Sequence, residues 1–123
     1  MDVVSRVLKF WYGEEPLDLA ADGNYRTAWF KKNDAFDQAI RSCFENDVLA
    51  AADGKLDDLK ETSAGVLTFC ILLDQFPRNL YRGSPQAFAG DPIALETAKD
   101  AIARGLDQKL GKTRRMFIYL PFE

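Results

Sequence analysis

The chain has 123 residues, of which 47% are hydrophobic, so it can bury the core of one compact domain but is too short for two of ordinary size. Sixteen Lys and Arg against nineteen Asp and Glu give a net charge of -3, which excludes the strongly basic surface of a dedicated nucleic-acid-binding protein. The sequence contains no histidine, which excludes histidine-based catalytic triads, histidine general bases and most zinc sites within the chain.

The first predicted element is a short amphipathic helix near the N-terminus, which Gly13 can end as a left-handed residue. The apolar residues that share one face of it are Val3, Val4, Val7, Leu8 and Trp11. The next segment, EEPLDLAADGNYRTAWFKKN, has no clean period. We predict a loop that places Trp29 and Phe30 on the body of the protein.

A longer helix is predicted from Asp34 to the turn at Asp53 and Gly54, with Asn33 or Asp34 accepting the first amide hydrogens. Its expected buried face consists of Phe36, Ile40, Cys43, Phe44 and Val48. Because Cys43 and Cys70 lie in apolar helical stretches without metal-ligand or disulfide spacing, we expect two buried, reduced thiols. Such thiols fit a cytoplasmic protein.

The run from Val66 to Leu73 is apolar on every side and is therefore predicted as a helix in the middle of the bundle. A strand is the competing interpretation, but only Val66, Thr68 and Ile71 are β-branched, and a cap at Thr62 or Ser63 favours the helix. Pro77 is expected to stop or kink this helix, because it has no amide hydrogen and its ring crowds the carbonyl of Leu73.

Two further helices are predicted in the last third of the chain. The first starts at Asp91 and Pro92, with Asp91 as the cap acceptor, and ends at Gly105. Its expected buried face is Leu95, Ala98, Ala101 and Ile102. The second starts near Lys112 or Thr113 and is perturbed by Pro121. Its basic residues Lys112, Arg114 and Arg115 are expected on an exposed face.

No strand pattern competes with these elements, so the sequence predicts an all-α fold of about five or six helices in antiparallel packing, forming a single domain over residues 1–123. The N-terminus is amphipathic, and no apolar run reaches about 18 residues, so neither a signal peptide nor a membrane span is predicted.

Three segments carry a family resemblance: VLKFWYG, WFKKNDAFDQAI and LLDQFPRNLYRGSPQAFAGDPIAL. They resemble the bacterial family catalogued as domain of unknown function 924, in order and over most of the chain. The resemblance implies an all-helical fold related to tetratricopeptide-like helical hairpins. It implies no biochemical activity.

The sequence departs from the family pattern in two places. Leu59 and Ser63 stand where the family tends to have Trp and Pro, which we expect to repack the region before the central helix without altering the fold. The family also continues beyond LPFE into a further helical segment, so the chain is expected to be C-terminally short relative to the family.

The junction LLDQFPRNLYR raises the main functional question. If the backbone stays helical through Pro77, then Asp74, Arg78 and Arg82, spaced by four residues, project from one side. In the functional interpretation they form an anion site for a carboxylate or phosphate, completed by Asn79 and with Tyr81 and Phe76 as apolar walls. In the structural interpretation Gln75, Arg78 and Asn79 satisfy carbonyls freed near Leu73, while Asp74 pairs with an arginine or caps the next turn.

An enzymatic role receives less support, although it stays open. Asp74 is the conceivable general base, but an adjacent arginine is expected to lower its pKa, which is unfavourable for a base near neutral pH. The acidic pairs Glu14–Glu15 and Asp57–Asp58 are expected on solvated loops rather than as metal ligands. We therefore predict no catalytic residue, no metal and no cofactor.

Three functions remain open. The first is an interaction module that binds a peptide or a partner protein. The second is a small-anion binding protein using Asp74, Arg78 and Arg82, and the third is a carboxylate-based enzyme. The apolar C-terminal segment MFIYLPFE further predicts a two-fold symmetric homodimer, with folding back into its own domain as the alternative. The residues expected at that interface are Met116, Phe117, Tyr119, Leu120 and Phe122.

Overall fold

A computed structural model describes residues 2–13 and 18–123 of the chain. These residues contain six α-helices and no strand, which confirms the all-α prediction. The helices are α1 (Val3–Tyr12), α2 (Asp34–Ala52), α3 (Ser63–Cys70), α4 (Phe76–Leu80), α5 (Asp91–Ala103) and α6 (Lys112–Tyr119). A π-helical segment, η3 (Ile71–Gln75), joins α3 to α4, and short 3-10 turns lie in several of the other connections.

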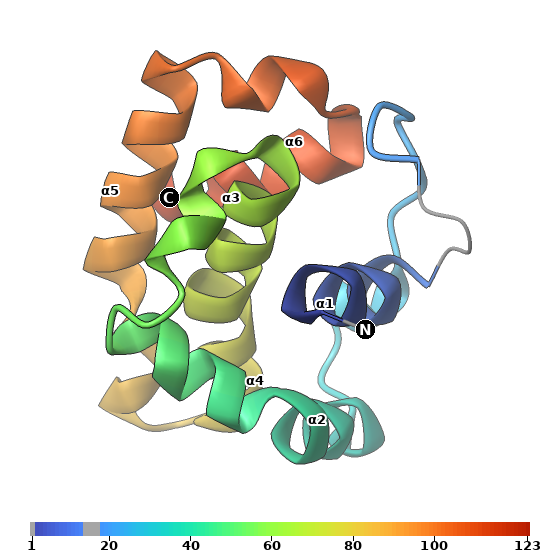
Figure 1. Cartoon of the computed structure of the whole chain (residues 1–123). Coiled ribbons are helices and arrows are strands. Elements are labelled where there is room, and N and C mark those ends of the chain that lie inside the picture. Colours follow the sequence, from blue (N-terminus) through green and yellow to red (C-terminus); the bar gives the residue numbers. More distant parts are fainter. Residues whose placement is uncertain (1, 14–17) are drawn as a thin grey trace.

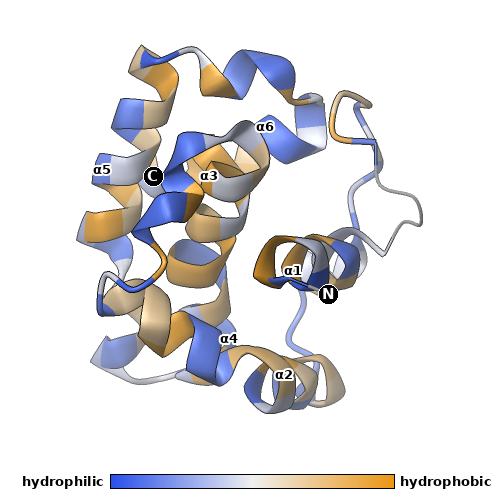
Figure 2. Cartoon of the chain, in the orientation of Figure 1, coloured by the Kyte–Doolittle hydropathy of each residue, from blue (hydrophilic) through white to orange (hydrophobic). Residues whose placement is uncertain are grey.

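The helix α3 occupies the middle of the bundle, with α1, α5 and α6 packed around it, while α2 packs against α4 (Figure 1). Colouring by hydropathy shows apolar residues on α3, whereas apolar and polar residues alternate along the outer helix α5 (Figure 2). Every residue from Val66 to Leu73 is at most 1% exposed, so the predicted central helix is confirmed.

Three predicted helix ends are also confirmed. Gly13 follows α1 in the left-handed region, at φ 68°, where a glycine avoids the steric cost of a side chain. The side chain of Asn33 accepts a hydrogen bond from the amide of Phe36, 3.1 Å away, at the start of α2. Thr62 accepts from the amide of Gly65 at 3.0 Å and begins α3.

The predicted buried faces of α2 and α5 are each wrong at one position that turns out to be exposed. Ile40, Phe44 and Val48 follow one another by four residues and are buried, but Cys43 lies one position away and is exposed. On α5 the buried face is formed by Ala94, Thr97, Ala98 and Ala101, which leaves Ile102 at 37% exposed. The prediction of a buried thiol holds for Cys70, where burial raises the pKa to about 12.

In the segment before α2, Trp29 is buried as predicted and donates a hydrogen bond from Nε1 to the carbonyl of Trp11 at 2.9 Å. The prediction for Phe30 is wrong, because 63% of this residue is exposed. Trp29 also contacts Phe117 of α6 at 4.9 Å between ring centroids, so the aromatic core links this segment to the last helix.

The basic start of α6 differs most from its prediction. Lys112 is exposed, but Arg114 is completely buried. Its guanidinium lies 4.6 Å from the centre of the Tyr12 ring and donates to Thr113 Oγ1 at 2.9 Å. A β-carbon at Gly23 would come within 1.8 Å of Arg114 Nη1, so the loop closes over the arginine. Arg114 is therefore a core residue rather than part of an exposed face.

Among the described residues, no helix is both long and apolar enough to cross a lipid bilayer.

Candidate functional site

The backbone remains helical through Pro77, so Asp74 and Arg78 lie one turn apart, but α4 ends at Leu80 and Arg82 follows it outside the helix. The amide of Phe76 bonds to the carbonyl of Ile71, five residues back, so the wider π turn precedes the proline. Pro77 then stands in the first turn of α4, where its missing amide hydrogen costs little. Gly90 packs against this turn, since a β-carbon there would lie 2.6 Å from the carbonyl oxygen of Leu73.

Arg78 lies between two carboxylates at this junction. Its Nη1 is 3.2 Å from Asp74 Oδ1, and its Nη2 donates to Asp91 Oδ2, also at 3.2 Å. Asp91 is the first residue of α5, and it pairs with Arg78 rather than accepting the cap hydrogen bond predicted for it. Gln75 donates to the other oxygen of Asp74 at 2.7 Å. Arg78 therefore ties α4 to the start of α5.

Asp74 is buried, with 3% of its side chain exposed. Burial raises the pKa of this carboxyl above its ordinary value of 3.8, and the opposing effect of the Arg78 guanidinium does not cancel the rise. The lowered pKa expected from the sequence is therefore wrong, because burial outweighs the nearby positive charge.

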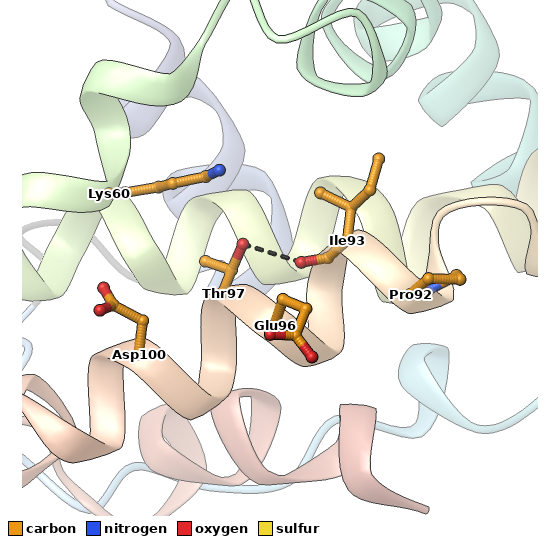
Figure 3. A pocket seen from close by; sticks show the side chains of 6 residues that line it. All are labelled: Lys60, Pro92, Ile93, Glu96, Thr97 and Asp100. Carbon is orange, nitrogen blue, oxygen red and sulfur yellow. Dashed lines mark hydrogen bonds between the residues drawn. The ribbon is translucent and has the colours of Figure 1, made fainter.

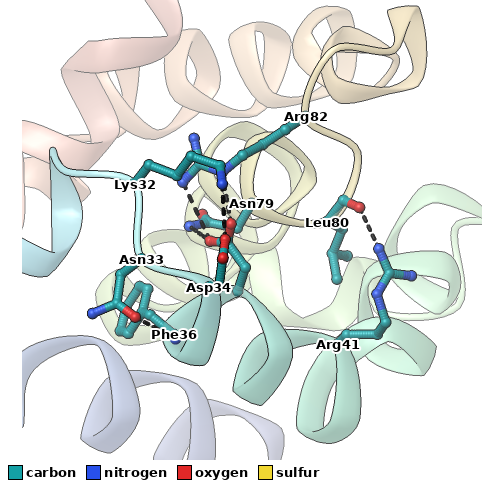
Figure 4. Close-up of polar contacts among 9 residues, drawn as sticks. Lys32, Asn33, Asp34, Phe36, Arg41, Asn79, Leu80 and Arg82 are labelled. Carbon is teal, nitrogen blue, oxygen red and sulfur yellow. Dashed lines mark hydrogen bonds and ion pairs between the residues drawn. The ribbon is translucent and has the colours of Figure 1, made fainter.

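Arg82 and Asn79 both bond to Asp37 of α2 and form a second cluster with it. Figure 4 shows the side chains of Arg82 and Asn79 close together. Arg82 donates from Nε to Asp37 Oδ2 at 2.6 Å and from Nη2 to Oδ1 at 3.2 Å, and Asn79 Nδ2 donates to Oδ1 at 2.8 Å. Burial raises the pKa of Asp37, but the hydrogen bonds from Arg82 and Asn79 outweigh it and hold the pKa below 3.8. The predicted capping of free carbonyls by Arg78, Asn79 and Gln75 is replaced by pairing with carboxylates.

Tyr81 lies away from the two arginines. Its hydroxyl donates to Glu45 Oε2 at 3.5 Å, and its ring lies 6.0 Å from the Arg41 guanidinium. Arg41 in turn donates to the carbonyl of Leu80, apart from the Asp37 cluster (Figure 4). Tyr81 is therefore not a wall of the predicted anion site, and the buried Phe76 is not one either.

Arg78 and Arg82 do line a concave surface, which we call the Phe88 groove. It has a volume of about 870 Å³ and is lined by Lys32, Arg78, Arg82, residues 83–85, Ala87 and Phe88. The Phe88 ring lies 5.3 Å from the Arg78 guanidinium, and 57% of the residue is exposed. All the charged residues that line the groove are cations, and the carboxylates that hold them lie outside its lining.

A second, smaller hollow of about 90 Å³ also borders the turn η4 (Pro85–Phe88), and we call it the Leu49 pocket. Its walls come from α2, the π segment, α4 and the turn itself. They are Val48, Leu49, Ala52, Leu73, Pro77, Tyr81, Gln86, Ala89 and Gly90. Leu49 is 47% exposed at this site.

A third hollow of about 460 Å³ follows α5, where Lys60 reaches over residues Pro92 to Asp100 (Figure 3). Its charged and polar groups are already engaged within the chain. Lys60 lies 4.8 Å from the Phe69 ring and 3.4 Å from Asp57, and Thr97 donates to the carbonyl of Ile93 at 2.8 Å. The lining of this hollow also lacks an exposed aromatic residue, which the Phe88 groove has in Phe88.

The two acidic pairs singled out in the sequence can be placed only in part. Asp57 and Asp58 are exposed in a 3-10 turn rather than in a loop, and Glu14 and Glu15 lie outside the described residues. Within residues 2–13 and 18–123, no three acidic or cysteine side chains are grouped so as to hold a metal ion.

The apolar C-terminal segment is divided between core and surface. Phe117 is completely buried against Trp11 and Trp29, so its predicted place in a dimer interface is wrong. Tyr119 and Phe122 are 39% and 49% exposed. Met116, Tyr119 and Leu120 line a shallow depression of about 340 Å³ with Tyr25, Lys112 and Arg115. We call the exposed Tyr119 and Phe122, together with the partly buried Met116 and Leu120, the α6 patch.

Several residues of the site were missed by sequence reasoning. Asp37 precedes its partners by 42 and 45 positions, and no local pattern announces such a contact. Asp91 was predicted as a helix cap only. It lies 13 residues after Arg78, and a chain that turns back once over this distance can bring the two side chains together. The exposure of Phe88 could have been predicted from the sequence, because Phe88 is a large apolar residue within a short turn segment, SPQAFAGD.

Comparison with known proteins places the chain beside proteins whose function is unknown. The family model described as bacterial protein of unknown function (DUF924) matches residues 7–123. A solved structure of a protein of unknown function from Agrobacterium tumefaciens is 37% identical, with a TM-score of 0.85, over 98% of this chain and 62% of that one. The chain thus spans less than two thirds of that relative. No curated protein matches it.

Proposed function

The chain belongs to the bacterial family of unknown function DUF924, and we propose that it is an interaction module that binds a segment of a partner protein in the Phe88 groove. The observation that carries the proposal is the exposed Phe88 beside three cationic side chains. An aromatic anchor next to arginine is the composition typical of binding hot spots.

The rigidity of the groove supports the same function. Arg78 is held by Asp74 and Asp91, and Arg82 is held by Asp37, so both guanidinium groups are oriented before any partner arrives. A surface that is already ordered loses less side-chain entropy when it binds. A volume of about 870 Å³ also suits a peptide segment better than a single small anion.

The small-anion alternative is weaker for a specific reason. The two arginines that would clamp the anion are already paired with carboxylates of the chain, so a free anion has to compete with Asp37 and Asp91. A thermal-shift screen of carboxylate and phosphate metabolites separates the two functions. Stabilisation of the wild type that is lost in Arg82→Ala would favour the anion.

The interaction module is tested by capture from lysate with a matched pair of variants. We expect Phe88→Asp to lose a partner that the wild type and Ile102→Asp both retain, because Ile102 is exposed on α5 outside the groove. A hot-spot residue is worth about 2 kcal/mol or more, which is about a thirtyfold loss of affinity. Equal retention by Phe88→Asp and wild type, for every captured protein, would contradict the proposal.

A second proposal concerns self-association through the α6 patch. Lys112 and Arg115 lie in the first turn of α6 and Glu123 follows its end, so two copies packed antiparallel about a two-fold axis would bring opposite charges together across Met116, Tyr119 and Leu120.

Because the two cysteines are free thiols, we place the protein in the reducing cytoplasm.

Light scattering over a dilution series tests the dimer. We expect a dimer mass at tens of micromolar for the wild type and a monomer mass for Phe122→Asp, because a charge in an apolar interface costs several kcal/mol. Leu49→Asp, at a similarly exposed residue outside the α6 patch, serves as the control. A monomer mass for the wild type would refute the dimer.

A further inference from the structure

The shallow depression beside α6 is bounded by two segments that the fold holds together. Its lining combines Tyr25, from the loop before α2, with one face of α6. The amide of Thr113 donates to the carbonyl of Asp22 at 3.0 Å, so this loop lies against the start of α6 (Figure 1). Within α6, the Tyr119 hydroxyl donates to the buried Asp107 at 2.6 Å. The walls of the depression are therefore held in place within a single copy of the chain.

The face of α6 in this depression has the spacing of a helix-pairing stripe. Its residues follow one another by three or four positions, as the contact positions of paired helices do. They are Lys112, Arg115, Met116, Tyr119, Leu120 and Glu123. Apolar and aromatic side chains occupy the middle of the stripe, with cations at its start and a carboxylate at its end. Such a stripe is suited to a second helix that lies along it.

The charges of this stripe are not neutralised within one copy. Lys112 and Glu123 are exposed and Arg115 is half-buried, and none of the three forms an ion pair with the residues that the structure describes. Arg115 and Glu123 are eight residues apart, or about 12 Å along the axis at about 1.5 Å per residue, and do not meet. In the Phe88 groove, by contrast, every cation already pairs with a carboxylate of the chain.

An antiparallel second copy brings these charges together in one register. When Tyr119 lies on the two-fold axis, residues at equal distances before and after it face each other across the two copies. Arg115 then faces the second copy's Glu123, four positions from Tyr119 on either side. Met116 faces the second copy's Phe122, three positions from Tyr119 on either side. A single register therefore satisfies both the charged and the apolar residues.

Resting on the proposed self-association, we infer that a second copy docks in this register. Its Phe122 enters the depression between Tyr25 and Met116, and its Glu123 pairs with Arg115. The depression of about 340 Å³ lies within the range of about 300 to 1,000 Å³ that holds whole small ligands, so one aromatic ring fits. Tyr25 is 59% exposed and Phe122 is 49% exposed, so their contact removes apolar surface from water.

Mixing two charge-reversed variants tests this register by light scattering. Arg115→Glu places two carboxylates opposite each other across the copies, and Glu123→Arg places two guanidinium groups opposite each other. Each variant alone is therefore expected to have a monomer mass at a concentration where the wild type is a dimer. An equimolar mixture of the two variants restores both attractive pairs, and it is expected to regain the dimer mass.

The possible results separate this inference from the self-association on which it rests. A dimer mass for either variant alone, or a mixture that stays monomeric, would overturn the register and leave the wild-type dimer standing. A monomer mass for the wild type would overturn both.

A matched pair of aromatic substitutions tests the apolar contact independently. Tyr25→Asp is expected to raise the dissociation constant of the dimer about tenfold or more, because it places a charge against the second copy's Phe122. Phe88→Asp is the control, since Phe88 is 57% exposed but lies outside the depression, and it should dimerise as the wild type does. Equal dissociation constants for Tyr25→Asp and wild type would overturn the placement of Phe122.

Discussion

Replacing Leu72 by alanine is expected to lower the free energy of unfolding by about 2 to 5 kcal/mol, measured by urea unfolding followed by circular dichroism. Leu72 is completely buried in the π segment, on which α2, α3, α4 and α5 all pack. Because four helices meet there, the surrounding chain can close only part of the cavity that the missing methyl groups leave.

The matched control for this variant is Leu49→Ala, which removes the same atoms from a residue that is 47% exposed. Its expected loss is within about 0.5 kcal/mol. Losses under about 1 kcal/mol in both Leu72→Ala and Leu73→Ala would contradict the position of the core described above.

Replacing Arg78 by alanine is expected to lower the free energy of unfolding by about 1 to 3 kcal/mol at neutral pH. The variant leaves the buried carboxylate of Asp74 with Gln75 but without its cation. Removing one partner of a fully buried ion pair usually lowers the free energy of unfolding by more than this. Because 38% of the Arg78 side chain is exposed, solvent screens its attraction to Asp74, and the expected loss is smaller.

The cost of Arg78→Ala should depend on pH in a defined direction. Burial raises the pKa of Asp74 above the unfolded value of 3.8, and removing Arg78 raises the pKa further. The folded variant then binds a proton more readily than the unfolded chain, so its deficit relative to wild type should shrink as the pH falls through the raised pKa toward 3.8. A deficit that is constant over this range, or absent at neutral pH, would mean that Arg78 does not serve Asp74.

The helices could be predicted from the sequence because their signals are local. The caps at Asn33 and Thr62 and the left-handed Gly13 each act within a few residues of the chain. The four-residue spacing of Ile40, Phe44 and Val48 likewise lies within one helix.

Burial of individual residues at the edge of a face could not be predicted in the same way. Cys43 and Ile102 lie next to buried positions on their helices, and only the placement of the neighbouring helices decides that both face solvent. The opposite error occurred at Arg114, whose charge suggests a surface residue. Tyr12 and the loop at Gly23 cover it, and both are about 90 or more positions away in the sequence.

The unusual composition of the junction predicts a candidate site there, but it does not predict the partners of its residues. Asp74 and Arg78 lie one helical turn apart and pair as expected, whereas Arg82 follows the end of α4 and pairs with Asp37. Asp37 and Asp91 come from α2 and α5, so the division into two ion-pair clusters depends on how three helices meet. The position of Tyr81 on the opposite side follows from the same packing.

Nuclear magnetic resonance of the uniformly ¹⁵N-labelled chain, titrated with a peptide selected on it from a phage-displayed library, tests the groove most directly. If the Phe88 groove is the binding surface, the largest amide shift changes should fall on Gly83, Ser84, Ala87 and Phe88, with little change at Glu96 or Asp100 of the hollow along α5. Changes concentrated on α5 or α6, with the amides of residues 83–88 unmoved, would contradict the proposed function.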